Sequence, residues 1–446
     1  MNPREGFRAR CDATPVTGSS PSASGTSVWV ARGARAFRRR PSRRSRQLSC
    51  SRCTADQAIL RTKERPEFPD AEADYRLFDL FAGCGALSIG FLLAGLDTGV
   101  ELGVGLAVES EEPPALAYKN NIGDVVKQAD IETLIDGELG AKLTAAERKL
   151  KKEIGELQLG LAGPPCQGHS DLNNHTRRSD PRNELYARVA RAAAVLEPKM
   201  LCVENVPAIR NDHAGVLETT RNELARLGYA VADEIIDTQL AGIPQRRRRH
   251  IMLACASGSG DPKAVLEKLV KHPCSDHLPR DVRWGIDDLK AIKSDATYDT
   301  ASIPSEENRK RIAYLFEHKC HNLPNPQRPK CHRDFEHTYS AMYGRLRWDA
   351  PAQTITSGYG SMGQGRYVHP GKRRTLTPHE AARLQTIPDW FAFDPTSTRT
   401  QIARMIGNAV PPFLGLELGR LLLPALAATT YAQGLSPRPI PRSIDS

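Results

Sequence analysis

The sequence predicts an α/β fold in which a doubly wound, mostly parallel, Rossmann-like sheet carries a smaller irregular region. Short apolar runs alternate with segments of helical period from residue 76 to about residue 257, and this alternation favours a parallel sheet. The first apolar run ends in closely spaced glycines, which suits a strand that turns sharply into a helix. Residues 256–345 break the alternation with short apolar runs and many Pro, Asn, His, Arg and Lys residues.

The predicted strands and helices follow one another in a regular order. Short apolar runs bounded by turn signals indicate buried strands, whereas apolar residues three and four positions apart indicate helices. The predicted strands are "RLFDLFAG" (76–83), "VGLAVES" (104–110), "VVKQADI" (125–131), "LQLGLAG" (157–163), "KMLCVENV" (199–206), "YAVADEIIDTQLAG" (229–242) and "RHIMLACAS" (249–257). The predicted helices lie at 86–96, 113–121, 137–158, 183–197, 215–228, 375–388 and 401–426.

The net charge of +10 belongs mostly to the N-terminal segment. Residues 1–50 contain 11 Arg, one Glu and one Asp, so the rest of the chain is close to neutral. Few apolar residues in periodic order predict disorder over residues 1–70. This Arg- and Ser-rich segment fits a nucleic-acid-binding arm, a transit peptide or an extension without a role. Its charge therefore says little about what the folded part binds.

The ten cysteines do not suggest a disulfide framework in a chain of 446 residues. Cys84, Cys202 and Cys255 lie in apolar runs and are expected to be buried, which favours a reducing compartment. A single C-x-x-C at 50–53 and a His/Cys group over 318–337 without standard spacing do not predict a metal site. No apolar run suggests a membrane span.

Glycines and acids mark the carboxyl ends of the first three predicted strands. Gly83 and Gly85 would let a ligand approach the backbone and the next helix N-terminus, although their spacing is not the dinucleotide G-x-G-x-x-G. Glu109 ends the second strand, where a carboxylate could hold two ribose hydroxyls, and Asp130 ends the third, near an adenine. Each feature alone also fits an ordinary loop, but three in succession favour a nucleoside-bearing cofactor.

Three further segments supply candidate reactive groups. Cys166 follows the fourth strand on a loop, "GPPCQGHS", that its prolines and glycines shape, and a thiol there is a candidate nucleophile. Glu204 ends the fifth strand and would face the same crevice. Four arginines in "PQRRRR" (244–249) precede the last strand. Alternate side chains of this run could point at a phosphate or a base, or the run could be a solvated face.

Six motifs together resemble those of the DNA cytosine-5 methyltransferases in order and rough spacing: "DLFAGCG", "GPPCQGHS", "VENV", "PQRRRR", "TLTPHEAARLQTIPDWF" and "IGNAVPP". The resemblance covers residues 76 to about 425 and implies a DNA (cytosine-5-)-methyltransferase that uses S-adenosyl-L-methionine. It also implies a catalytic domain over 71–255, a target-recognition region over 256–375, helices over 376–430 that complete the catalytic domain, and a disordered tail over 431–446.

The family's cofactor-contacting positions can be assigned residue by residue. The resemblance implies that Glu109 binds the ribose and that Asp130 and Ile131 flank the adenine. The full implied set is Phe81, Gly83, Cys84, Gly85, Glu109, Asp130, Ile131, Pro165, Leu185, Asn408 and Val410. Since Asn408 and Val410 lie far along the chain from the glycines, the C-terminal helix is expected to pack back beside the first strand.

The resemblance also implies how the reaction proceeds. Cys166 would add to C6 of a cytosine flipped out of the duplex, Glu204 would hydrogen-bond N3 and the exocyclic amine, and Arg249 would contact O2. Arg247 would support the loop or the DNA. The implied DNA-contacting residues are Gln167, Ser170, Gln245 and Arg366.

The implied substrate is duplex DNA, and the implied setting is bacterial modification or restriction-modification, with a possible cognate restriction endonuclease. A monomer without membrane association, located in the cytoplasm with the nucleoid, is expected. The alternatives are a tRNA cytosine-5 methyltransferase and a catalytically silent DNA-binding subunit, while the glycine spacing disfavours a dinucleotide oxidoreductase.

Two residues depart from the family pattern. His169 replaces the usual Phe, and His379 replaces a common Arg, which removes a charge expected to be structural.

Overall fold

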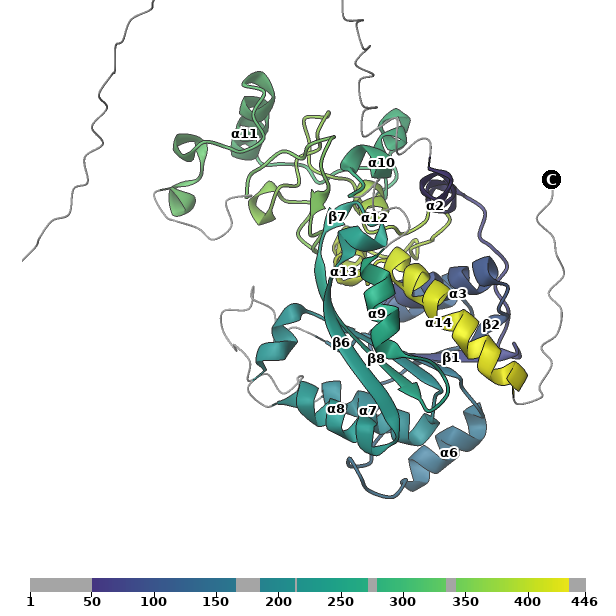
Figure 1. The fold of residues 1–446 in the computed structure, drawn as a ribbon. Coiled ribbons are helices and arrows are strands. Elements are labelled where there is room, and N and C mark those ends of the chain that lie inside the picture. The colour runs from purple at the N-terminus through teal and green to yellow at the C-terminus, as the bar shows by residue number, and fades with distance from the viewer. Residues whose placement is uncertain (1–49, 166–184, 213–214, 272–278, 334–341, 433–446) are drawn as a thin grey trace, which may run out of the picture. The chain divides into compact units, whose positions relative to one another are not determined.

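The computed structural model describes residues 50–165, 185–212, 215–271, 279–333 and 342–432, which lie in one compact unit (Figure 1). A seven-stranded sheet in the order β3-β2-β1-β4-β5-β8-β6 forms its centre. β8 runs antiparallel to both of its neighbours, and the other described strands of this sheet share one direction. The strands are β1 (Tyr75–Leu80), β2 (Leu102–Glu109), β3 (Val126–Gln128), β4 (Leu159–Ala162), β5 (Met200–Asn205), β6 (Tyr229–Asp237) and β8 (Arg248–Ala256). The predicted doubly wound, mostly parallel sheet is confirmed.

Helices cover both faces of the sheet, because alternate strand side chains point to opposite sides. Leu77 and Leu161 point into one hydrophobic core, whereas Phe78 and Ala162 point into the other. The first core includes side chains of α3 (Ala86–Thr98), α4 (Glu112–Asn121), α9 (Pro262–Val270) and α14 (Pro412–Ala432). The second includes side chains of α5 (Ile131–Leu134), α6 (Ala145–Ile154), α7 (Leu185–Leu196) and α8 (Val216–Arg226).

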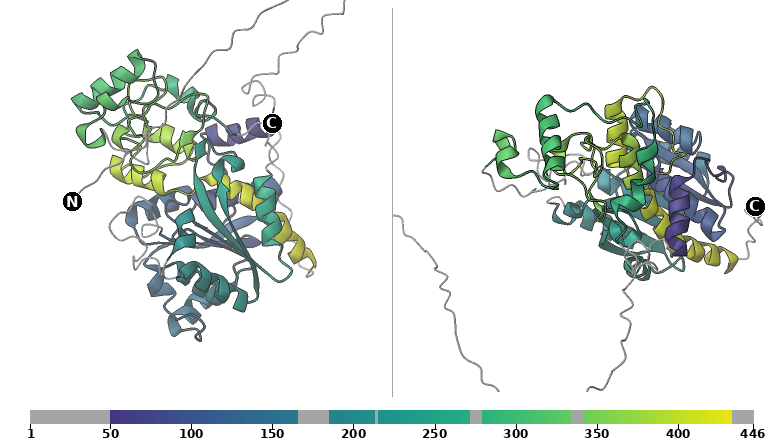
Figure 2. Two further views of the ribbon diagram at one scale, coloured as in Figure 1. Left: turned by 60° about the vertical axis from the view of Figure 1, so that its left-hand side comes forward. Right: turned by 90° about the horizontal axis from the view of Figure 1, so that it is seen from above.

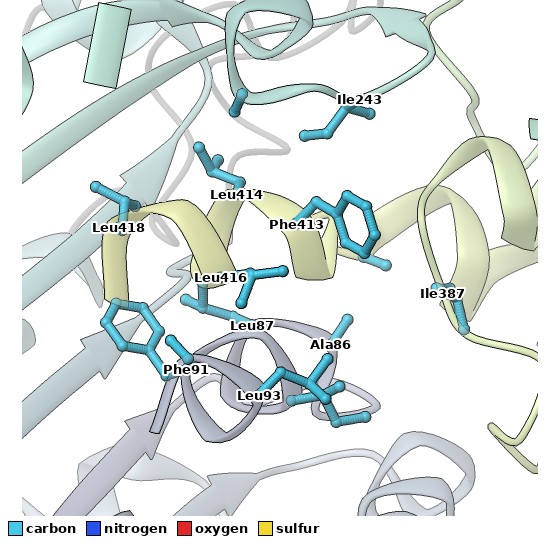
Figure 3. Packing of buried hydrophobic residues seen from close by; sticks show 14 of the residues in the cluster. Ala86, Leu87, Phe91, Leu93, Ile243, Ile387, Phe413, Leu414, Leu416 and Leu418 are labelled. Atoms are coloured by element: carbon cyan, nitrogen blue, oxygen red, sulfur yellow. The ribbon is translucent and has the colours of Figure 1, made fainter. Parts of the chain in front are cut away.

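The C-terminal helix α14 packs tightly against α3, the helix that follows the first strand. A Cβ atom built on Gly90 of α3 would lie 2.1 Å from the carbonyl oxygen of Pro412, so the close approach requires glycine. Phe91 and Leu416 fill the interface around this point (Figure 3). The segment 399–429 is long and apolar enough to cross a membrane, but 72% of its most apolar window is buried. It is therefore a core element, and the predicted return of the chain to the first strand is confirmed.

The predicted target-recognition region has its own small core, formed by Ile312, Leu315, Leu323, Tyr343, Met362 and Val368. Its described elements are α10 (Val282–Ile286), η5 (Asp288–Ala291), α11 (Glu306–Glu317), η6 (Asn325–Gln327), η7 (Lys330–His332), β9 (Ala352–Gln353) and η8 (Met362–Gln364). Figure 2 shows these segments, mainly in green, beside the yellow-green helices α12 (Pro378–Leu384) and α13 (Arg399–Asn408). Residues 262–270, predicted to belong to this region, instead form α9 and pack on the sheet.

The short strand β7 (Gln245–Arg246) joins the recognition region to the catalytic sheet. It pairs with β9 in a separate two-stranded sheet, with Arg246 opposite Gln353. β8 begins only two residues later, at Arg248. The arginine motif therefore contributes backbone to both sheets. Two 3₁₀ helices flank the neighbouring strands, η2 (Pro207–Asn211) after β5 and η3 (Thr238–Ala241) after β6.

The expected disorder over residues 1–70 is wrong for part of that range. Ser51–Arg61 forms helix α2, whose side chains Cys53, Asp56 and Leu60 are buried. Asp56 contacts the guanidinium groups of Arg280 at 2.6 Å and Arg420 at 3.4 Å. These partners lie more than two hundred positions away, so the local composition could not reveal them. Residues 1–49 and 433–446 lie outside the described residues.

The described cysteines are mostly buried. Cys84, Cys202 and Cys255 are buried, as predicted, and burial raises the pKa of the Cys84 thiol to about 12 and that of the Cys255 thiol to about 11. All described cysteines whose state can be assigned are free thiols. Within the described ranges, no group of three or more His, Cys, Asp and Glu side chains could hold a metal ion.

Candidate active site

A cavity of about 440 Å³ opens at the carboxyl ends of the strands, next to β1. In the strand order, β1 has β2 on one side and β4 on the other. The chain builds the sheet outward from β1 first through β2 and β3, and then on the opposite side through β4 and β5. Ligands of open α/β sheets bind at such a switch point. The cavity walls include the predicted residues Phe81, Gly83, Cys84, Glu109, Asp130, Ile131, Pro165, Leu185, Asn408 and Val410.

Two glycines shape the corner between β1 and α3 in different ways. Gly83 (φ +56°) faces open space, since no atom lies within 4 Å of a Cβ built on it. A ligand can therefore approach its backbone closely. Gly85 (φ +85°) is not among the residues that line the cavity. A Cβ there would lie 2.6 Å from Ile122 and 2.9 Å from Tyr118, so the corner is tightly packed at this position. Phe81 has a φ of +57°, a strained value for a residue with a side chain.

Glu109 ends β2 and faces the cavity with its carboxylate partly occupied. The backbone amides of Gly83 and Glu111 donate to its two oxygens, each at 2.8 Å. A carboxylate can accept about four hydrogen bonds, so two sites remain for a pair of neighbouring hydroxyl groups. Burial raises the pKa of this carboxyl group. Asp130 caps α5 by accepting a hydrogen bond from the Glu132 amide at 3.0 Å, which fixes its position beside Ile131.

Asp79 is a wall residue that the sequence analysis missed. Its side chain accepts a hydrogen bond from Ser88 at 2.7 Å, and Tyr118 in turn donates to Ser88 at 3.0 Å. Burial raises the pKa of Asp79 to about 7. The signal was a single acid inside the apolar strand "RLFDLF", because a buried charge needs a partner or a function.

Arg404 was also missed. It pairs with Glu111 at 2.5 Å, and both side chains line the cavity.

Glu204 and Arg249 meet at the edge of the same cavity. Their strands β5 and β8 are antiparallel neighbours, and the register places Glu204 opposite Ile251. The Arg249 Nε lies 2.6 Å from Oε1 of Glu204. This contact is too poorly aligned to count as a hydrogen bond, and no described group donates one to Oε1. Oε1 is itself buried, and the Glu204 side chain lines the cavity.

The four arginines of the motif alternate between buried and exposed positions. Arg247 and Arg249 line the cavity, whereas Arg246 and Arg248 are exposed. The Arg247 guanidinium is tied to backbone, because it donates to the carbonyl oxygens of Ile355 (3.1 Å), Gly407 (3.4 Å) and Ala409 (3.2 Å). It therefore holds the β9 segment and the end of α13 against the motif, which fits a supporting role.

The predicted DNA contact by Gln245 is wrong for this structure, because the side chain is fully buried. Its amide donates to the Leu384 carbonyl oxygen at 3.0 Å and accepts from the Ile355 amide at 2.9 Å. Arg366 is half-buried near the surface, where it donates to Asn322 at 2.6 Å. Arg374, another basic residue of this segment, instead forms two contacts of 2.6 Å with Glu380.

The loop that carries Cys166, Gln167, His169 and Ser170 lies outside the described residues. The chain enters it from a defined point, since Pro164 and Pro165 line the cavity. The side chain of Asn205, the neighbour of Glu204, donates to the Pro164 carbonyl oxygen at 3.4 Å. The start of the loop and the acid at the end of β5 are therefore tied together at the cavity edge.

His379 takes over much of the electrostatic role expected of an arginine. Its Nδ1 lies 2.8 Å from Asp299 and its Nε2 lies 2.9 Å from Asp389. Despite burial, the hydrogen bonds that His379 donates to these two carboxylates raise its pKa. The expected loss of a structural charge is therefore only partial, because the histidine can carry that charge when it is protonated.

Comparisons with known proteins agree with this geometry. The sequence matches the family described as C-5 cytosine-specific DNA methylase over residues 75–422. It is 42% identical over 364 residues to the Type II methyltransferase M1.BsuMI of Bacillus subtilis (strain 168), covering 81% of this chain and 84% of that protein. It is 28% identical to the Type II methylase M.HgiDII of Herpetosiphon aurantiacus, covering 81% of this chain and 97% of that protein.

Solved structures support the fold alone, since their sequence identities are low. The S. pombe Dnmt2 methyltransferase matches with a TM-score of 0.54 and 17% identity, covering 81% of this chain and all of that chain. A putative DNA modification methyltransferase encoded within an E. coli prophage matches with a TM-score of 0.52 and 23% identity, covering 79% of this chain and all of that chain.

Proposed function

Because this chain belongs to the C-5 cytosine-specific DNA methylase family, we propose that it methylates a flipped-out cytosine of duplex DNA through an adduct between Cys166 and C6, with S-adenosylmethionine as methyl donor. That it is a DNA (cytosine-5)-methyltransferase follows from the family and the 42% identical relative. The observation that carries the detailed proposal is the Glu204–Arg249 pair at the edge of the glycine-lined cavity.

The cavity residues fit S-adenosylmethionine, which supplies an electrophilic methyl group when bound. The open space in front of Gly83 allows close approach of a ligand, and Glu109 has acceptor sites left for the two ribose hydroxyls. Asp130 and Ile131 would flank the adenine. Asn408 and Val410, brought beside the first strand by the α3–α14 packing, would close the cavity from the other side.

Each reactive side chain has a defined part in the proposed chemistry. The Cys166 thiolate forms a bond to C6, which makes C5 nucleophilic enough to take the methyl group. Glu204 hydrogen-bonds N3 and the exocyclic amine and supports protonation at N3, while Arg249 contacts O2. Loss of the C5 proton then breaks the sulfur–C6 bond and releases the methylated base. The target must leave the stack, because C6 is inaccessible within a duplex.

The setting of the reaction is inferred from the relatives. Two of them are named as Type II enzymes, so we infer a modification role with a possible cognate restriction endonuclease. A monomer located in the cytoplasm and associated with the nucleoid fits this role. Gln167 and Ser170 are proposed to contact the DNA near the target base.

Tritiated S-adenosylmethionine tests the proposal with duplex DNA and transfer RNA as parallel substrates. We expect label in the DNA alone, and bisulfite sequencing of DNA from an expressing host would give the site. Cys166→Ser should abolish transfer while cofactor binding is retained, whereas Cys320→Ser, a matched change in the recognition region, should leave transfer intact. DNA with 5-fluorocytosine at the target should form a denaturant-resistant complex. Turnover by the Cys166→Ser enzyme, or label in transfer RNA only, would overturn the proposal.

A further inference from the structure

We propose that Arg246, Arg347 and Arg366 form a phosphate-binding cluster that holds the DNA backbone beside the target cytosine. This inference rests on the proposed function and adds to it a second contact region outside the cavity. The cluster lies on the exposed side of the arginine motif, whereas Arg247 and Arg249 of the same motif point into the cavity.

The fold brings these three arginines together from segments far apart in the sequence. β7 and β9 pair in parallel, which places Arg246 opposite Gln353. The Gln353 side chain packs against the backbone of Gly365, where a Cβ would lie only 1.9 Å from its Nε2. Arg366 is the next residue along the chain. Figure 1 shows β7 where the green recognition segments meet the catalytic sheet.

The third arginine and the support of Arg366 come from the strand-like segment that carries Arg345. The backbone of Arg345 pairs with that of Val368, and its amide donates to the His321 carbonyl oxygen at 2.8 Å. Asn322, which follows His321, accepts the hydrogen bond from Arg366. Arg347 lies two residues beyond Arg345. These segments are thus held together by backbone pairing and by the contacts of the Gln353 and Arg366 side chains.

Acids among the described residues balance only one of the three charges of this cluster. No described carboxylate contacts Arg246 or Arg366, and the partner of Arg366 is the neutral amide of Asn322. Arg347 alone has an acidic partner, Asp349, at 3.1 and 3.2 Å. Burial and the nearby charges of Arg246 and Arg347 lower the pKa of Arg366. Grouped cations without counter-charges favour an anionic ligand.

Other described arginines of the recognition region either pair with acids or are held by an aromatic ring or by backbone carbonyl oxygens. Arg309 pairs with Glu306, Arg373 pairs with Glu317, and Arg374 pairs with Glu380. Arg345 lies over the ring of Phe316, 4.5 Å from its centre. Arg328 and Arg333 donate to backbone carbonyl oxygens. The cluster is therefore distinct from the general basic character of the region.

Phosphate is favoured over a base as the ligand. Recognition of guanine requires a free two-pronged guanidinium edge. One edge of Arg347 is occupied by Asp349, and Nη2 of Arg366 is occupied by Asn322. Single N–H groups from neighbouring arginines suit a phosphodiester, which needs positive charge more than a planar partner. Such a contact positions the duplex without reading its sequence.

Equilibrium binding to duplex DNA over a series of salt concentrations tests the proposal. Arg246→Gln and Arg366→Gln should each weaken binding for every sequence tested and should reduce the slope of log K against log[salt] by about 0.9. Arg347→Gln should have a smaller effect because Asp349 already offsets its charge. The KM for DNA should rise, while kcat at saturating DNA and the KM for S-adenosylmethionine should stay unchanged.

Two controls separate the cluster from a general loss of charge or of folding. Arg226→Gln removes an exposed arginine of α8, paired with Glu223 on another part of the catalytic domain, and should leave the salt slope unchanged. Arg246→Lys should retain most of the wild-type slope. An unchanged slope in both Gln variants, or a loss confined to one target sequence, would overturn the proposal. Because binding is measured without methyl transfer, failure of the wild-type reaction would overturn the proposed function instead.

Discussion

Asp56 and Glu204 are both buried carboxylates in contact with arginines, but their surroundings differ. Asp56, 1% exposed, lies among Arg52, Arg280 and Arg420 at distances of 2.6–3.5 Å. Glu204, 8% exposed, forms an ion pair only with Arg249 among the described residues and borders the cavity. The first carboxylate is surrounded by cations of the protein, whereas the second keeps an oxygen without an aligned donor.

The difference separates a structural ion cluster from a reactive one. The Asp56 carboxylate is enclosed by cations of the protein, whereas Glu204 borders a cavity that can admit a ligand. A flipped cytosine would supply donors to the Glu204 carboxylate, which borders the cavity. Asp56 is enclosed by its arginine partners, and its cluster connects α2, α14 and the start of the recognition region.

The Asp56 cluster also reaches the reactive region indirectly. Arg280 donates to the Gly242 carbonyl oxygen at 3.0 Å, two residues before the arginine motif begins. Gln57 of α2 donates to the Trp284 carbonyl oxygen at 2.8 Å. Helix α2 lies outside the matched family range of 75–422. It nevertheless supports the segment that positions Arg247 and Arg249.

The largest expected effect is that of Glu204→Gln on catalysis. The amide cannot support protonation at N3, so kcat should fall by about 10²–10⁴-fold, the range for lost general acid–base catalysis. The free energy of unfolding should change less than in Asp56→Asn, because Glu204 pairs with one arginine at the cavity edge rather than with three. Single-turnover methyl transfer and chemical denaturation measure the two quantities. Near-normal turnover in this variant would remove Glu204 from the reaction.

Asp56→Asn should show the opposite pattern. Removing this charge leaves the buried Arg280 without an acidic partner, while Arg52 and Arg420 keep Glu417. Breaking a buried ion pair typically costs about 3–5 kcal/mol of stability. Turnover per folded molecule should be largely retained below the melting transition. Glu223→Gln, which breaks a surface pair with Arg226, is the matched control and should cost less than about 1 kcal/mol. Equal losses in the two variants would remove the distinction.

Much of the fold and the strand-end residues of the site could be predicted from the sequence. Strand-end residues such as Gly83 and Glu109 were identifiable because β1 and β2 are locally patterned and parallel strands end at one edge. Asp79 was missed because its partner Ser88 becomes apparent only when α3 packs on β1. The buried role of Gln245 and the order of α2 depend on contacts between residues more than a hundred positions apart.

His379 provides an intermediate case between the two carboxylate sites. Asp389 is contacted by Arg383, a permanent cation, and by His379, a cation that titrates. Hydrogen bonds from Arg383 and His379 lower the pKa of Asp389 despite its burial, so it is ionised near neutral pH. The ring of Tyr298 stacks on His379 with centroids 4.7 Å apart. The charge on this histidine therefore links the segment around Asp299 to helix α12.

The smallest expected effect is the pH dependence of this link. Folding raises the pKa of His379 above its usual value of 6.5, so its stabilisation is complete below that value and is lost as the pH rises through the folded pKa. His379→Arg should remove this fall in the free energy of unfolding, on the order of 1 kcal/mol, the difference between charge-assisted and neutral hydrogen bonds. Denaturant unfolding across a pH series measures it. Parallel curves for wild type and variant would show that the histidine carries no charge in the folded protein.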